Sequence, residues 1–238
     1  MRAGDIDVLH KVVLSKAGLG TYWHVYSSRY APTASNPHSQ ARLAWRDGAH
    51  GMFYTGETRA AALWETVLRY ASIDNGYVYT DRFHLKGMML ARLELTFDAS
   101  VLDLRSPYRR AVVNASSELD EQWERMLKDP DHANTHNFTM RTMEQLRAAG
   151  HEHGAALRWY SRQCASAAAT LFFEPRMQPQ WWTFRQKDLY RLDSPEGEEQ
   201  IRIALAEQGL HWRGAPVSDD FSPPQNADMN DGPMNVRH

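Results

Sequence analysis

Residues 51–70 read GMFYTGETRAAALWETVLRY, and the prediction of the fold starts from this stretch. Positions 52–55 are apolar or β-branched apart from Tyr54, which predicts a short strand, and Gly56 marks a turn. From about Thr58, apolar residues recur at helical spacing, which predicts an amphipathic helix. The stretch is therefore expected to form a strand, a turn and a helix.

Glu65 lies inside the predicted helix, beside Ala61 and Leu68 on the shoulder of its apolar stripe. A carboxylate at such a position is half-buried, and half-buried carboxylates are typical of functional sites. The alternative is a surface ion pair between Glu65 and Arg69 four residues later, which contributes only a few tenths of a kcal/mol. The helix alone leaves both interpretations open.

The composition excludes several classes of protein. The 238 residues carry 27 basic and 29 acidic side chains, so no basic excess points to a nucleic-acid partner. No apolar run approaches the length of a membrane-spanning helix, and the charged N-terminal segment does not resemble a secretory signal. The single cysteine, Cys164, excludes an intrachain disulfide and is compatible with a reducing compartment. We expect a cytoplasmic protein, and the sequence leaves homo-oligomerisation open.

The pattern along the chain predicts a mixed α+β fold. Residues 1–20 are expected to form an N-terminal helical extension, with its amphipathic helix at 5–17, and residues 20–213 the main domain with a C-terminal helix. Residues 214–238 contain hardly any apolar side chains, which predicts a disordered tail. Within the domain we expect strands at 21–26, 52–55, 87–95, 101–104, 155–160 and 170–173, strand pairing at 181–192, helices at 58–70, 138–149 and 194–209, helical pieces within 105–127, an irregular segment at 72–86 and a loop at 129–136.

Several familiar motifs are absent. The chain has no Walker or Rossmann glycine pattern and no GxSxG nucleophile elbow. The segment 151–153 (HEH) and the pair His132 and His136 lack the spacing of a zinc helix, so no metal is expected. Cys164 lies among small residues and is expected to be a buried apolar side chain.

The remaining candidates occur in the order Arg29, Arg42, Tyr54, Glu65 and Ser161. Arginines suit a diphosphate, an aromatic ring suits a planar base, and a lone carboxylate suits positive charge developing on a ribose. Ordinary glycosidases need a second carboxyl group to protonate the leaving oxygen. Nicotinamide leaves NAD as a neutral molecule, so a single glutamate can suffice for that bond. This chemistry makes the set coherent without selecting NAD.

The segment YWHVYSSRYAPTASNP, followed by ARLAW, by residues 51–70 and by WYSRQ at 159–163, resembles the RES domain. That family is named after an arginine, a glutamate and a serine, and it includes toxins of RES–Xre toxin–antitoxin pairs. The most specific part of the resemblance is an arginine before a loop, a tyrosine ending a strand and a glutamate eleven residues later. In this chain these are Arg42, Tyr54 and Glu65, and Ser161 matches the family serine.

The resemblance implies an ADP-ribosyltransferase-like fold with a split mixed sheet, and an enzyme that degrades NAD by hydrolysis or phosphorolysis of the nicotinamide–ribose bond. Glu65, Arg42 and Ser161 would be the catalytic residues. The side chains expected to bind NAD are Arg29, Tyr54, His24 and Tyr30. NAD would be the substrate and no cofactor is expected. An Xre-type antitoxin would be the protein partner.

The chain departs from the family pattern in two places. His24 stands where the family has an arginine in the first strand, and Arg42 lies in QARLA instead of a glycine-rich segment. A histidine is shorter than an arginine and mostly neutral at pH 7, so it binds phosphate more weakly. Two alternatives therefore accompany the NAD-degrading enzyme: a non-catalytic RES-like module that binds a nucleotide or a partner, and an ADP-ribosyltransferase.

Overall fold

The computed structural model describes residues 7–214, and these form one large sheet, four α-helices and a small second sheet. The large sheet has nine strands in the order β1-β7-β8-β9-β3-β2-β6-β10, and β11 also pairs with β6. Only β7 and β8 pair in parallel, and the other neighbours are antiparallel. The predicted mixed α+β class is confirmed. The strands are β1 (Ser15–Lys16), β2 (Gly20–Ser27), β3 (Gly51–Gly56), β6 (Met88–Leu95), β7 (Ser100–Asp103), β8 (Ala156–Tyr160), β9 (Ala168–Glu174), β10 (Trp182–Thr183) and β11 (Leu189–Arg191).

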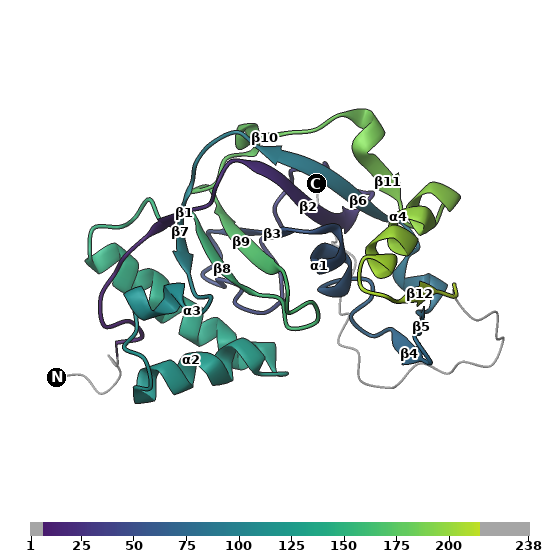
Figure 1. The fold of residues 1–238 in the computed structure, drawn as a ribbon. Helices are drawn as coiled ribbons and strands as arrows, with labels where there is room; N and C mark the ends of the chain where they lie inside the picture. The colour runs from purple at the N-terminus through teal and green to yellow at the C-terminus, as the bar shows by residue number, and fades with distance from the viewer. Residues whose placement is uncertain (1–6, 215–238) are drawn as a thin grey trace, which may run out of the picture.

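The helices lie in two groups beside the large sheet (Figure 1). The first group is α2 (Glu118–Lys128) and α3 (His132–Ala148), which lie near β7 and β8. The second is α1 (Arg59–Trp64) and α4 (Pro195–Ala206), which lie near the small sheet of β4 (Ser72–Asp74), β5 (Tyr77–Tyr79) and β12 (His211–Trp212). Short 3-10 turns occur at Arg82–His84, Tyr108–Ala111, Pro179–Trp181 and Gln186–Asp188.

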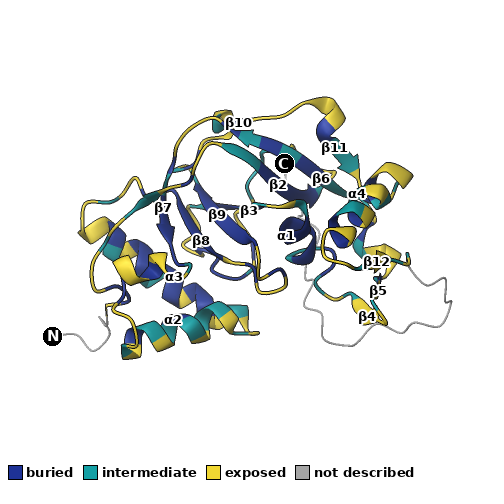
Figure 2. Ribbon diagram, in the orientation of Figure 1, coloured by how far each residue is buried: buried dark blue, intermediate teal, exposed yellow. Residues whose placement is uncertain are grey.

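Burial follows these layers. The middle strands β8, β9 and β3 are buried along most of their length, whereas α2 shows a solvent-exposed side (Figure 2). Successive residues of a strand pack into hydrophobic cores on opposite faces of the sheet. On β3, Tyr54 packs against the core that includes Trp123 of α2 and Phe138 of α3, and Phe53 belongs to the core on the other face. The second helix group has its own core around Leu63 and Leu205.

Most of the predicted elements are confirmed, with four corrections. Residues 72–86 contain β4 and β5 instead of an irregular segment, and α3 begins at His132, inside the expected loop, where Asp131 caps it. The predicted helix at 58–70 is confined to Arg59–Trp64, and turns follow. The expected tail at 214–238 lies, apart from Gly214, outside the described residues.

The N-terminal helix is the fourth correction, because residues 7–20 contain β1 and no helix. The backbone N–H groups of Val8 and Leu9 both donate to Gln145 Oε1, each at 3.0 Å. Leu9 O accepts from Gln145 Nε2 at 2.7 Å, and Val8 O accepts from Trp123 Nε1 at the same distance. These backbone groups are thus used by α2 and α3 and cannot form helical hydrogen bonds. The apolar residues of this segment are buried without a helix.

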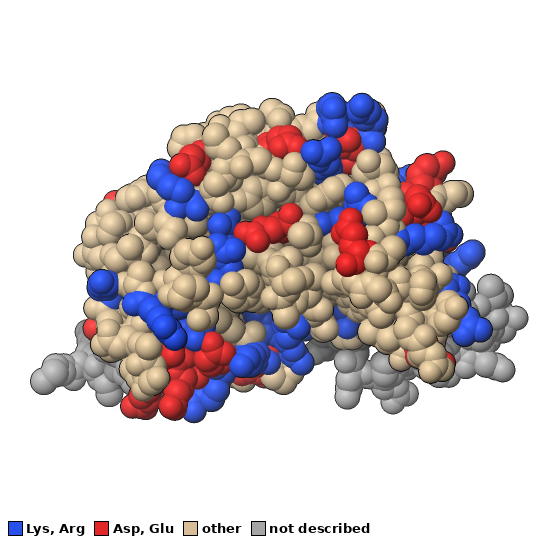
Figure 3. All heavy atoms as spheres, viewed as in Figure 1, with Lys and Arg blue, Asp and Glu red and all other residues tan. Residues whose placement is uncertain are grey.

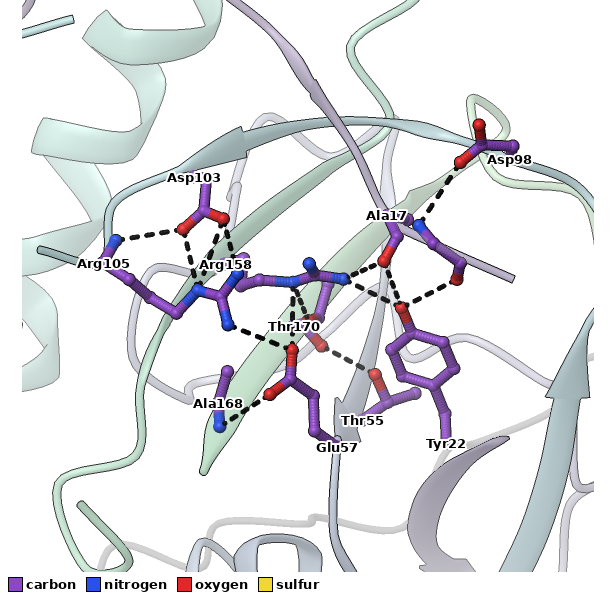
Figure 4. A network of polar contacts seen from close by, with 11 residues as sticks. Ala17, Tyr22, Thr55, Glu57, Asp98, Asp103, Arg105, Arg158, Ala168 and Thr170 are labelled. Atoms are coloured by element: carbon purple, nitrogen blue, oxygen red, sulfur yellow. Dashed lines mark hydrogen bonds and ion pairs between the residues drawn. The ribbon is translucent and has the colours of Figure 1, made fainter. Parts of the chain in front are cut away.

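A polar network around Arg158 connects residues of five strands, β2, β3, β7, β8 and β9 (Figure 4). Arg158 donates to Tyr22 Oη at 2.8 Å, to Thr170 Oγ1 at 3.2 Å and to the carbonyl of Ala17. Glu57 lies 3.6 Å from Arg158 and 3.3 Å from Arg105, which also pairs with Asp103 at 2.7 Å. The buried guanidinium is therefore compensated by both charge and hydrogen bonds, as a buried cation requires.

We expect Arg158→Met to lower the free energy of unfolding by about 3 kcal/mol, because it removes one partner from a buried charged network. Urea unfolding of both proteins measures this loss. The control is Arg92→Met, which removes a half-exposed partner of Glu94 and should cost less than about 1 kcal/mol. Equal losses for the two variants would show that the network adds nothing beyond a surface pair.

Candidate active site

The pairing of β8, β9 and β3 positions both Ser161, which follows β8, and α1, which follows β3. Beyond the ends of the strands, Ser161 N donates to Ala167 O, and Glu57 N donates to Ala168 O, each at 2.9 Å. At Gly56 the chain turns sharply into α1: a Cβ there would lie 2.5 Å from the backbone nitrogen of Ala62. Only glycine permits this approach. Thr58 then caps α1 by accepting from Ala61 N at 3.1 Å.

Glu65 lies at the C-terminal end of α1 and not in its interior. Thr66 Oγ1 donates back to Ala62 O at 2.6 Å, and Leu68 N bonds to Leu63 O at 2.9 Å, which closes the helix after Trp64. The chain then continues in turns to Tyr70. Because the helix does not continue, Arg69 is not one turn above Glu65, and no ion pair between them occurs.

Ser161 and Glu65 are joined by a hydrogen bond. Ser161 Oγ donates to Glu65 Oε1 at 2.6 Å, and Arg162 N donates to the same oxygen at 3.0 Å. Ser161 Oγ in turn accepts from Cys164 N at 2.9 Å, so its proton is directed at the carboxylate. Among residues 7–214, no group donates to Glu65 Oε2. The carboxylate is therefore held through Oε1, and Oε2 is left available to a ligand.

Arg42 lies on the loop between β2 and β3, and its side chain is nearly buried. Its Nη1 donates to the carbonyls of Met126 at 3.1 Å and Leu127 at 3.0 Å, in the last turn of α2. These carbonyls lie at the negative end of the helix dipole, and the only backbone donor to either of them among residues 7–214 is Asp129 N, 3.4 Å from Met126 O. Burial lowers the pKa of Arg42, and the nearby carboxylate of Glu65 acts in the opposite direction.

Tyr54 holds the loop that carries Arg42. Its Oη donates to the backbone carbonyl of Arg42 at 2.8 Å. Burial raises the pKa of Tyr54, so the phenol keeps its proton at neutral pH. The four residues of the family pattern, Arg42, Tyr54, Glu65 and Ser161, are therefore brought together by direct bonds and by charge.

Within residues 7–214, three other candidate residues make no hydrogen bond or ion pair with Arg42, Tyr54 Oη, Glu65 or Ser161. Arg29 and Tyr30 lie in an exposed turn after β2, and their side chains make no hydrogen bond or ion pair with any of residues 7–214. His24 is buried on the other face of the sheet, where its ring lies against Phe53. Its Nδ1 donates to the backbone carbonyl of Tyr54 at 2.6 Å. Substrate binding by these three residues stays a prediction.

The structure adds three cationic or polar side chains to the candidates. Arg69 Nη2 lies 2.7 Å from His132 Nε2, and Arg162 Nη1 donates to Lys128 O at 3.3 Å. Partial signals for the two arginines are visible in the sequence: Arg69 is four residues after Glu65, and Arg162 follows Ser161 in WYSRQ. The two histidines of the pair His132 and His136 contact different groups: His132 lies beside Arg69, and His136 Nε2 lies 3.0 Å from Ala41 O. Within residues 7–214, no group of three or more His, Cys, Asp and Glu is arranged for a metal ion.

The family model of the RES domain matches residues 21–185, which include the whole set of Arg42, Tyr54, Glu65 and Ser161. The chain belongs to the RES domain family. No curated protein matches the sequence. Among the described residues of this RES domain, no helix is long and apolar enough to cross a membrane.

A solved structure shows the same fold as this RES domain. It is a chain of the crystal structure of the M. tuberculosis MbcT–MbcA toxin–antitoxin complex, with a TM-score of 0.51 and 16% sequence identity. The match covers 80% of this chain and 92% of that chain. At this identity the likeness is one of fold, and it confirms the predicted α+β architecture with a large mixed sheet and surrounding helices.

The buried histidine of this RES domain makes its stability depend on pH. Burial lowers the pKa of His24 from 6.5 to about 4, and Nε2 has no hydrogen-bond partner among the described residues. The folded chain thus keeps His24 neutral while the unfolded chain binds a proton below pH 6.5. The free energy of unfolding therefore falls as pH drops from about 6.5 towards 4.

Between pH 7 and pH 4.5 we expect His24 to account for a loss of about 2 kcal/mol in the free energy of unfolding. His24→Asn keeps a donor for the Tyr54 carbonyl and removes the titration, so the variant should lose that much less than wild type over the same range. Urea unfolding at the two pH values measures the difference. The same loss in both proteins would contradict the assignment.

Proposed function

We propose that this RES domain cleaves the nicotinamide–ribose bond of NAD. The observation that carries the proposal is the carboxylate of Glu65, which is held through Oε1 by Ser161 and Arg162 and has no donor on Oε2 among residues 7–214. A carboxylate fixed in this way is suited to stabilise positive charge that develops on a ribose ring. The arginines beside it are suited to the diphosphate of the same molecule.

The reaction needs little beyond this arrangement. As the bond between ribose C1′ and the pyridinium nitrogen breaks, its electron pair goes to that nitrogen and neutral nicotinamide leaves. No acid has to protonate the leaving group, so one carboxylate suffices where an ordinary glycosidase uses two. Water or inorganic phosphate then bonds to C1′ and its proton passes to solvent. NAD is the substrate in this proposal, and the chemistry draws on the side chains of the chain alone.

Each residue has a distinct role in the proposed reaction. Glu65 faces the developing cation on the ribose, and Ser161 fixes the orientation of that carboxylate. Arg42 binds phosphate, and Tyr54 positions Arg42 by bonding to its backbone carbonyl. Ser161 therefore acts as a positioning residue and forms no covalent intermediate.

The direct test is release of nicotinamide from NAD by the purified protein, followed by chromatography. We expect Glu65→Gln to lower the rate about 100-fold or more, because the variant loses the charge that stabilises the transition state. Glu121→Gln, on the exposed side of α2, is the matched control and should act like wild type. Addition of EDTA should leave the rate unchanged. Lack of release by wild type, or equal release by Glu65→Gln, would refute the proposal.

Ser161→Ala should lower kcat about 10-fold, which is less than Glu65→Gln does, because the backbone N–H of Arg162 still holds Oε1 in place. Steady-state kinetics with NAD compare the three proteins. A loss for Ser161→Ala as large as that for Glu65→Gln would assign the serine a direct part in the chemistry.

The proposal extends to the biological role as a toxin. The similar solved chain comes from a toxin–antitoxin complex, and this supports an Xre-type antitoxin as the partner of the present chain. Expression of the wild-type chain alone should then lower cellular NAD and stop growth, and expression of Glu65→Gln should do neither. Growth arrest with unchanged NAD would separate toxicity from the proposed chemistry.

A further inference from the structure

Three arginines meet around Glu65 without an ion pair. Arg42, Arg69 and Arg162 have no carboxylate oxygen within 4.0 Å anywhere in residues 7–214. Arg42 is buried, Arg69 is half-buried and Arg162 is exposed. The two other buried arginines do have carboxylate partners: Arg109 lies 2.8 Å from Asp120 and also pairs with Glu124, and Arg158 lies within the network of Figure 4. Arg59 also lacks a carboxylate partner among the described residues, so the distinctive feature of this site is that three such cations lie together.

Two of the three cations are held by the C-terminal end of α2. Arg42 bonds to the carbonyls of Met126 and Leu127, and Arg162 bonds to the next carbonyl, that of Lys128. Neutral carbonyl oxygens fix the position of a guanidinium group without cancelling its charge. Basic side chains gather on the surface beside this end of α2 (Figure 3).

The third cation, Arg69, is held by His132. An arginine can only donate, so His132 Nε2 accepts from it at 2.7 Å and the imidazole is neutral. Burial lowers the pKa of His132 to about 4, and the charges of Arg69 and Arg42 act in the same direction. His132 therefore stays neutral at physiological pH and orients Arg69 without adding a charge. Apart from this nitrogen, the guanidinium of Arg69 makes no hydrogen bond with residues 7–214.

The three guanidinium groups are close enough to repel one another. After burial and Glu65, the charges of Arg162 and Arg69 are the next causes that act on the pKa of Arg42, and both lower it. Asp129 acts in the other direction with a smaller effect, and its oxygens accept from Asp131 N and from Asn134. Even with Asp129 counted, three cations face two carboxylates.

We propose that Arg69, oriented by His132, and Arg162 complete with Arg42 a site for the two phosphate groups of a dinucleotide whose ribose lies against Glu65. The inference rests on the proposed function and adds to it the residues that select a diphosphate. Two phosphates bring two negative charges to a place with excess positive charge, and the free guanidinium nitrogens offer paired donors of the geometry that phosphate oxygens accept. The diphosphate cations are thus Arg42, Arg69 and Arg162, and the exposed Arg29 is not needed.

The first experiment measures binding of ADP-ribose, which carries the diphosphate and lacks nicotinamide, to the full chain by calorimetry. Arg69→Gln and Arg162→Gln should each weaken binding about 10-fold, and less so at high salt, where the charges are screened. The matched control is Arg110→Gln, an exposed arginine without a side-chain hydrogen bond in residues 7–214, and it should bind as wild type does. Thermal unfolding checks that each variant is folded. Because the two arginines are tested separately, the site can still be tested if one of the variants fails to fold.

The second experiment separates phosphate recognition from chemistry. Nicotinamide riboside has the same glycosidic bond as NAD and no diphosphate. In Arg69→Gln and Arg162→Gln, KM for NAD should rise about 10-fold while turnover of nicotinamide riboside stays at the wild-type value. His132→Phe should raise KM for NAD with little change in kcat, and His132→Gln, which restores an acceptor, should recover part of the loss.

The outcomes distinguish this inference from the proposed function. If wild type cleaves NAD but Arg69→Gln and Arg162→Gln bind ADP-ribose as tightly as wild type, the phosphate site is refuted and the proposed function stands. If wild type releases no nicotinamide yet binds ADP-ribose in a way that depends on both arginines, the site stands and the reaction is refuted. Equal weakening in Arg110→Gln would show a general charge effect and would also refute the site.

Discussion

The hydrogen bond from Ser161 to Glu65 is the contact on which the rest of the site depends. It joins residues 96 positions apart and links the end of β8 to the end of α1. It can form only when β8, β9 and β3 are paired in register, since Ala167 and Ala168 place both partners. A slip of one residue in either ladder would turn the side chains of β3 or β8 to the opposite face. The sheet therefore acts as the rigid support of the carboxylate.

Most strands of the large sheet followed from local patterns, the candidate site rested on the family resemblance, and the failures had distant causes. Alternation in residues 87–95 predicted β6, and the position of Glu65 beside an apolar stripe suggested a site. The N-terminal helix was wrong because Gln145 and Trp123, far along the chain, bind the backbone of Val8 and Leu9. Arg69 and His132 were missed as a pair because their contact requires α3 to meet the turns after α1.

The polar network around Arg158 and the arginine cluster around Glu65 differ in how their charges are compensated. Around Arg158, carboxylates and hydroxyls compensate each charge, and the result fixes strands to one another. Around Glu65, carbonyls and a neutral imidazole hold three arginines whose charges are only partly compensated by Glu65 and Asp129. Such an arrangement costs stability through repulsion, as strained functional sites often do. This difference separates the structural network around Arg158 from the proposed binding site around Glu65.

The order of the site residues along the chain has a consequence for synthesis. Arg42, Tyr54 and Glu65 leave the ribosome early, whereas His132, Ser161 and Arg162 follow only after most of the domain has been made. β9, the strand between β3 and β8, is made later still, at residues Ala168–Glu174. A partly synthesised chain thus contains the carboxylate but none of the groups that hold and orient it. The ribosome completes almost the entire domain before this chain can assemble its site.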